Sequence, residues 1–137
     1  MKCTVDHVGI AVPALSEVLV FYRDVLGLEI EAPEEVASQR VRAQFAQPLD
    51  AAGPAASLEL VEATTPDSPV ARFVERRGPG LHHLALRVPD LLAALAELKA
   101  RGVRLIDEAP RPGAHGALVA FVHPSSTHGV LLELIQR

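Results

Sequence analysis

Apolar and polar residues alternate in DHVGIAV at residues 6–12 and again in HHLALRV at residues 82–88. A period of two predicts a β-strand in each stretch. In the first strand the alternation places Val5, His7, Gly9 and Ala11 on one face. The two stretches align when His7 is placed on His83, so the chain repeats itself.

A helix is predicted after each of these strands. Apolar residues recur with helical spacing over residues 15–26 and again over residues 91–98. Gly27 and Gly102 follow these stretches, and glycine commonly ends a helix. Three strand-like stretches come next in each copy, namely residues 28–32, 38–47 and 57–61 in the first and residues 103–107, 116–124 and 131–135 in the second.

The pattern therefore predicts an α+β protein built from two tandem βαβββ modules, at about residues 1–66 and 78–137. Residues 68–77 between them predict one short helix, with Ser68 as its N-cap and Pro69 at its first position. We find no flexible linker, so we expect residues 1–137 to form a single domain. The turn-rich residues 47–57 are expected to form a hairpin loop.

Composition narrows the classes of function. The chain has 137 residues and 49% hydrophobic residues, which is enough for one core. A net charge of −4 gives no case for nucleic-acid binding, and no apolar run is long enough for a membrane helix. Without a signal-peptide pattern and with one cysteine, Cys3, which we interpret as a small apolar strand residue, we expect a cytoplasmic protein.

Four residues occupy matched positions in the two copies: His7 with His83, and Glu59 with Glu133. Each glutamate lies between two leucines in a predicted strand, facing either solvent or a polar cleft. Alone, such a histidine or glutamate is usually not a ligand. If the copies pack about a pseudo-two-fold axis, however, all four face one point.

Two imidazoles and two carboxylates form a chemically sensible site for one divalent metal ion. Mixed nitrogen and oxygen ligation suits zinc, cobalt, nickel, manganese or iron. We expect cobalt first, with zinc, nickel, manganese or magnesium as alternatives. The other histidines, His82, His115, His123 and His128, lie on the opposite strand face or in turns and are weaker ligand candidates.

These features resemble the vicinal oxygen chelate superfamily. More narrowly, the stretches DHVGIAV, FYRDVLGLE, LHHLALRV, RPGAHG and GVLLEL resemble the methylmalonyl-CoA epimerase family along nearly the whole chain. The resemblance implies one curved mixed sheet around the metal, with His7, Glu59, His83 and Glu133 as ligands. It also implies an isomerase that interconverts (2R)- and (2S)-methylmalonyl-CoA, a small acyl-CoA substrate, and a homodimer.

Epimerisation removes the α-proton from one face and returns it to the other, which two bases do most simply. We hypothesise that Glu59 and Glu133 act as this catalytic pair as well as ligands, each loosening from the metal when it acts. The chain departs from the family at Ala43, where some members carry an acid, at Ser125, where lysine is frequent, and at His128, where glycine is common. Arg111 and His115 could replace the lysine as contacts to the CoA phosphates.

The closest rival function is a glyoxalase I-like metal-dependent lyase that acts on a glutathione hemithioacetal through the same four ligands. An extradiol dioxygenase fits less well, because it usually needs three protein ligands and more open positions. A drug-sequestering protein of the bleomycin-resistance kind needs an apolar, often aromatic cleft. Only 4% of this chain is aromatic, and it has no tryptophan.

Overall fold

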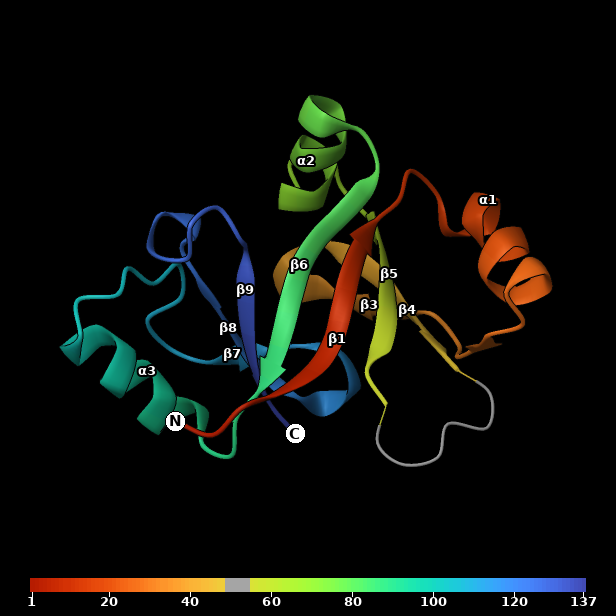
Figure 1. The fold of residues 1–137 in the computed structure, drawn as a ribbon. Helices are drawn as coiled ribbons and strands as arrows, with labels where there is room; N and C mark the ends of the chain where they lie inside the picture. The colour runs from red at the N-terminus through yellow and green to blue at the C-terminus, as the bar shows by residue number, and fades with distance from the viewer. Residues whose placement is uncertain (49–54) are drawn as a thin grey trace. The chain divides into compact units, whose positions relative to one another are not determined.

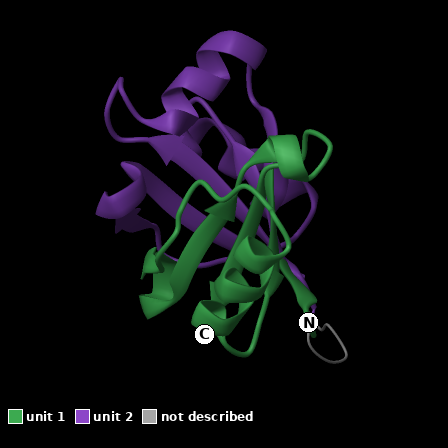
Figure 2. Cartoon of the chain, turned by 90° about the vertical axis from the view of Figure 1, so that its left-hand side faces the viewer, with its two compact units in different colours: residues 1–6, 83–137 green, residues 7–82 purple. Residues whose placement is uncertain are grey.

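The computed structural model describes residues 1–48 and 55–137. The chain forms two compact units, unit 1 from residues 1–6 and 83–137, and unit 2 from residues 7–82 (Figure 2). The two boundaries fall inside strands β1 (Thr4–Ala11) and β6 (Gly80–Arg87), so both strands contribute residues to both units. The six N-terminal residues therefore group with the second copy of the repeat.

Unit 2 contains a mixed sheet with the strand order β2-β4-β5-β1 (Figure 1). Its further strands are β2 (Glu29–Ile30), β3 (Glu34–Val36), β4 (Val41–Gln47) and β5 (Ser57–Ala63). β5 runs parallel to β1 and antiparallel to β4, and β3 also pairs with β4. The predicted hairpin loop between β4 and β5 lies mostly outside the described residues.

The helices of unit 2 largely match the prediction. α1 (Leu15–Leu19) continues as the π-helix η1 (Val20–Val25), and Gly27 follows with a φ of +70°. α2 (Pro69–Arg77) begins after Ser68, whose side chain accepts a hydrogen bond from the Val70 backbone N–H. A short 3₁₀-helix, η2 (Ala37–Gln39), leads into β4. Buried Val12, Leu15 and Leu60 form the core between α1 and the sheet.

Unit 1 repeats the same architecture with the strand order β6-β9-β8-β7. Its further strands are β7 (Arg111–Pro112), β8 (Leu118–Val122) and β9 (Leu132–Gln136). β9 runs parallel to β6 and antiparallel to β8. The 3₁₀-helices η3 (Ala114–Gly116) and η4 (Pro124–Ser126) flank β8. α3 (Leu91–Ala100) packs on β8 and β9 through Leu91, Ala94 and Leu95, which lie in one buried cluster with Leu134.

One predicted strand, residues 103–107, is absent from unit 1. Only Leu105 forms a β-bridge there, to Val122. The Ile106 and Asp107 N–H groups both donate to the same Phe121 carbonyl, so the segment bends away instead of continuing a ladder. The first strand after the helix is instead β7. Unit 2 also contains β3, which the repeat pattern did not predict.

The repeat extends to the register of the strands. Gly9 lies opposite Glu59 in unit 2, and Ala85 lies opposite Glu133 in unit 1. The α+β fold made from two copies of one module is therefore confirmed. Within residues 1–48 and 55–137, no helix is long and apolar enough to cross a membrane.

Candidate metal centre

Both matched glutamates are buried, and each is paired with a small residue on the neighbouring strand. Glu59 and Glu133 are 6% and 3% exposed. Each lies opposite a residue with little or no side chain, Gly9 or Ala85. The histidine two residues earlier on that strand shares the face of the small residue, so it is the diagonal neighbour of the glutamate. The sequence left open whether Glu59 and Glu133 face solvent or a polar cleft, and their burial excludes a solvent-exposed face.

In unit 2, the His7 imidazole lies beside the Glu59 carboxylate. His7 Nε2 is 3.5 Å from Glu59 Oε2, and the His7 side chain is 1% exposed. The Phe45 ring meets the His7 ring edge-on, with the ring centroids 5.5 Å apart. Phe45 lies directly opposite Glu59 across β4 and β5. This unit therefore holds a buried His–Glu pair walled by a phenyl ring.

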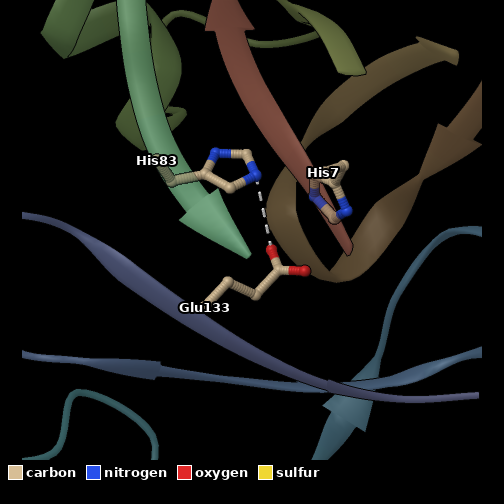
Figure 3. Close-up of side chains that lie close together, drawn as sticks. All are labelled: His7, His83 and Glu133. Atoms are coloured by element: carbon tan, nitrogen blue, oxygen red, sulfur yellow. Dashed lines mark ion pairs between the residues drawn. The ribbon is translucent and has the colours of Figure 1, made fainter. Parts of the chain in front are cut away.

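Unit 1 contains the same arrangement, shown for His83 and Glu133 by the dashed line in Figure 3. His83 Nε2 is 3.6 Å from Glu133 Oε2. The Phe121 ring meets the His83 ring edge-on at a centroid distance of 5.8 Å, and Phe121 lies opposite Glu133 across β8 and β9. The two pairs are therefore matched in partner atoms, in burial and in their aromatic neighbour.

The separation within each pair fits two ligands of one ion better than a hydrogen bond. An N–H···O hydrogen bond spans about 2.7–3.2 Å, which is shorter than both separations. Two atoms that each bind an ion at about 2.0–2.2 Å lie roughly 3–3.5 Å apart. His7, His83 and Glu133 each offer a buried ligand atom of a suitable kind. The donor set therefore fits a divalent metal ion.

The phenyl rings were missed in the sequence, although a signal was present. Phe45 and Phe121 have the same spacing along the chain as His7 and His83. Applying that spacing to every residue, rather than only to titratable ones, would have found them.

The remaining histidines have other surroundings. His82 stacks edge-on against Phe73, and burial lowers the pKa of His82 to about 4, so its ring is neutral near pH 7. His123 Nδ1 accepts from the Ser125 N–H at the start of η4. His115 and His128 have positive φ values of 59° and 55°.

The structure shows the surroundings of three further residues discussed in the sequence analysis, Ala43, His128 and Cys3. Ala43 is a buried methyl group on β4, so this chain places no acid there. His128 adopts a left-handed backbone, a conformation that glycine adopts without steric cost. Cys3 is exposed and lies just before β1, so its interpretation as a small apolar strand residue was wrong.

Comparison with known proteins bears on the same conclusion. The model of the Glyoxalase/Bleomycin resistance protein/Dioxygenase superfamily matches residues 6–121. Ethylmalonyl-CoA/methylmalonyl-CoA epimerase of Cereibacter sphaeroides is 38% identical over 96% of each chain.

Solved structures agree over nearly the whole chain. A methylmalonyl-CoA epimerase in complex with methylmalonyl-CoA and NH4+ is 36% identical, with a TM-score of 0.92 over 99% of this chain and 95% of that one. A variant of Streptomyces coelicolor methylmalonyl-CoA epimerase in complex with 2-nitronate-propionyl-CoA is 36% identical, with a TM-score of 0.90 over 97% and 93%. The chain therefore belongs to the methylmalonyl-CoA epimerase family of this superfamily.

Proposed function

We propose that the chain interconverts the (2R) and (2S) forms of methylmalonyl-CoA. The observation that carries the proposal is the duplicated buried His–Glu pair, found in a fold shared with an epimerase that holds methylmalonyl-CoA. The glyoxalase I alternative has no support from the relatives described above. The expectation of a small acyl-CoA substrate agrees with the ligands named for the two solved relatives.

The metal site in this proposal unites both pairs around one divalent ion, with His7, Glu59, His83 and Glu133 as ligands. Two neutral imidazoles and two carboxylates balance its charge, and cobalt, zinc, nickel, manganese or magnesium would serve. When bound, the ion would supply a Lewis acid that stabilises negative charge on the thioester oxygen. Moving the α-proton to a carboxylate unaided faces a pKa gap on the order of ten units, or roughly 14 kcal/mol.

The proton at C2 is handled, in this proposal, by Glu59 and Glu133. One carboxylate removes the proton from one face of C2, and the other returns a proton to the opposite face. Ala43 leaves the position of a further family acid without a titratable group, which favours assigning the work to these two residues. The nitronate named for the Streptomyces relative is a planar anion at C2, as the enolate of the substrate would be.

The phenyl rings contribute by excluding water. Phe45 and Phe121 are 3% and 6% exposed, and each covers one edge of a histidine. A dry surrounding strengthens electrostatic interactions and protects the carbanionic intermediate from unselective protonation by solvent. The rings would also fix the orientation of the imidazoles.

The direct test is incubation with methylmalonyl-CoA in deuterium oxide, with and without a chelator. We expect deuterium to enter at C2, and both epimers to appear from either one. The chelator should abolish exchange, and added Co²⁺ should restore it. Turnover of a glutathione hemithioacetal without exchange at C2 would contradict the proposal.

Assembly, organisation and location complete the proposal. We propose a cytoplasmic homodimer whose protomers each form one domain, as the resemblance to the family implies. Sedimentation equilibrium of the metal-loaded protein at micromolar concentration would test the dimer. A mass equal to the 14.6 kDa chain would contradict it.

A further inference from the structure

Arg111 on β7 lies over the Phe121 ring, which also contacts His83, a proposed metal ligand. Its guanidinium carbon is 5.6 Å from the centroid of the Phe121 ring. Arg111 Nε also faces Asp107 Oδ1 at 3.4 Å, and Asp107 Oδ2 accepts from the Phe121 N–H. Asp107 thus braces the arginine above the ring. The Arg111 side chain is 32% exposed, so part of it is open to solvent.

The ring beneath Arg111 leads directly to the proposed centre within the same unit. Phe121 contacts His83 edge-on and lies opposite Glu133 across the strand pair. One phenyl ring therefore separates the guanidinium from the buried His–Glu pair. The Arg111 guanidinium therefore lies at the edge of the proposed centre. This position suits a contact to the reacting acyl group better than a contact to the distant CoA phosphates.

The equivalent place in unit 2 carries the opposite charge. Arg111 lies opposite Val119 across β7 and β8, and Glu34 lies opposite Ala43 across β3 and β4. Val119 and Ala43 are spaced along the chain as His83 and His7 are, so they occupy matched positions of the repeat. The two halves thus agree in the candidate ligands and the phenyl ring but differ in charge at this position.

We propose that Arg111 binds the free carboxylate of the acyl-CoA substrate and thereby directs it to the half that contains His83 and Glu133. This inference rests on the proposed function. Methylmalonyl-CoA is itself asymmetric about C2, with an anionic carboxylate on one side and a neutral thioester on the other. A carboxylate has two oxygens, so it can accept charge-assisted hydrogen bonds from a guanidinium while it also contacts a second partner. Glu34 would repel the same group.

This assignment differs from the contact to the CoA phosphates expected from the sequence alone. The two alternatives differ in which CoA esters should bind more weakly when Arg111 is replaced. A phosphate contact acts on every CoA ester alike. A carboxylate contact acts only on esters whose acyl group carries a carboxylate.

Binding of two non-epimerising ligands separates the alternatives. We would measure Kd for malonyl-CoA and propionyl-CoA by calorimetry, on cobalt-loaded protein and on chelator-treated protein. The variants are Arg111→Met and Arg111→Lys. Arg101→Met is the control, because Arg101 is an exposed arginine just after α3 that pairs with Glu97 on the same helix. Thermal melting of each variant checks that it is folded.

We expect Arg111→Met to weaken malonyl-CoA binding by about tenfold to a hundredfold and propionyl-CoA binding by less than about twofold. Arg111→Lys should retain part of the preference, since lysine keeps the charge but not the planar fork. Chelator treatment should leave a residual preference for malonyl-CoA in the wild type that Arg111→Met removes. Arg101→Met should bind both esters as the wild type does.

Equal weakening of both esters by Arg111→Met would overturn the proposal in favour of a phosphate contact. Unchanged binding of both would overturn it in favour of a purely structural role. Failure of the proposed function gives a different result, namely a wild type that neither exchanges deuterium at C2 nor prefers malonyl-CoA. A wild type that epimerises, combined with an Arg111→Met variant that still prefers malonyl-CoA, would sink only the inference.

Discussion

At the scale of single residues, each of the two buried glutamates proposed as ligands lies opposite a small residue, Gly9 or Ala85. These two positions place little or no side chain beside Glu59 and Glu133, whereas a larger side chain would compete with the carboxylates for space. A leucine at either small position would push the glutamate away from its histidine. The proposed site therefore depends on Gly9 and Ala85, although neither has a side chain that could bind a metal or a substrate.

Replacing the two glutamates separately tests their role as bases. In Glu59→Gln and Glu133→Gln, we expect solvent deuterium exchange from one epimer to fall by about 10²–10⁴-fold, with a different epimer affected in each variant. Glu97→Gln on the surface of α3 serves as the control. Metal content is measured for each protein. Equal loss from both epimers in only one variant, at full metal content, would argue against a divided role.

The left-handed backbone at His128 makes a prediction about stability. With a φ of 55°, His128 has a steric cost that glycine does not, although glycine loses more entropy on folding. We expect His128→Gly to raise the free energy of unfolding by about 0.5–1 kcal/mol in urea titrations. His128→Ala, which keeps a Cβ, should give no such gain. An equal gain from both variants would show that loss of the imidazole, rather than relief of strain, is responsible.

At the scale of elements, the sequence predicted what depends on neighbouring residues and missed what depends on distant ones. Alternation and helical spacing predicted β1, α3 and the end of each helix at a glycine. The starts of α1 and α3 have further partners that no local pattern reveals: Glu62 Oε2 accepts from Leu15 N, and Gln136 Oε1 accepts from Leu91 N. For the same reason the sequence could not tell strand from bridge at residues 103–107.

Ser68 offers a direct measure of how much a local cap stabilises its helix. Its side chain is fully buried and accepts from Val70 N at the start of α2. We expect Ser68→Ala to lower the free energy of unfolding by about 1–2 kcal/mol, at the upper part of the range for caps because the orphaned N–H is buried. Exposed Ser16 in α1 provides the control. Ser16→Ala should change the free energy of unfolding by less than about 0.5 kcal/mol. Equal effects would refute the capping role.

At the scale of the whole molecule, the repeat explains why so much of the proposed centre could be predicted. Two imidazoles and two carboxylates at matched positions were visible because duplication preserved both their type and their spacing. The strand pairing then gave nearly the same His–Glu separation in each unit, 3.5 Å and 3.6 Å. The position of Arg111 beside Phe121 could not be predicted in this way. It depends on the pairing of β7 with β8, and unit 2 carries a glutamate at the matched position.

The chain ends are joined within unit 1 by one buried carboxylate. Asp6 accepts hydrogen bonds from both Arg87 and Arg137, and its side chain is 1% exposed. We expect Asp6→Asn to lower the free energy of unfolding by roughly 2 kcal/mol, less than for a fully buried pair because Arg87 is half exposed. In the exposed Asp67–Arg40 pair, solvent screens the charges, so Asp67→Asn should lower the free energy of unfolding by less than Asp6→Asn does. Chemical denaturation of both variants would show whether Asp6 has the larger effect; equal losses would contradict this account.

The most direct test of the account is the metal stoichiometry and ligation of the cobalt-loaded protein. Anomalous diffraction and elemental analysis should find one ion per chain, with two histidine nitrogens and two glutamate oxygens at about 2.0–2.2 Å. His7→Ala and His83→Ala should each lose that same ion. Two ions per chain, one at each His–Glu pair, or an ion bound away from both pairs, would contradict the account.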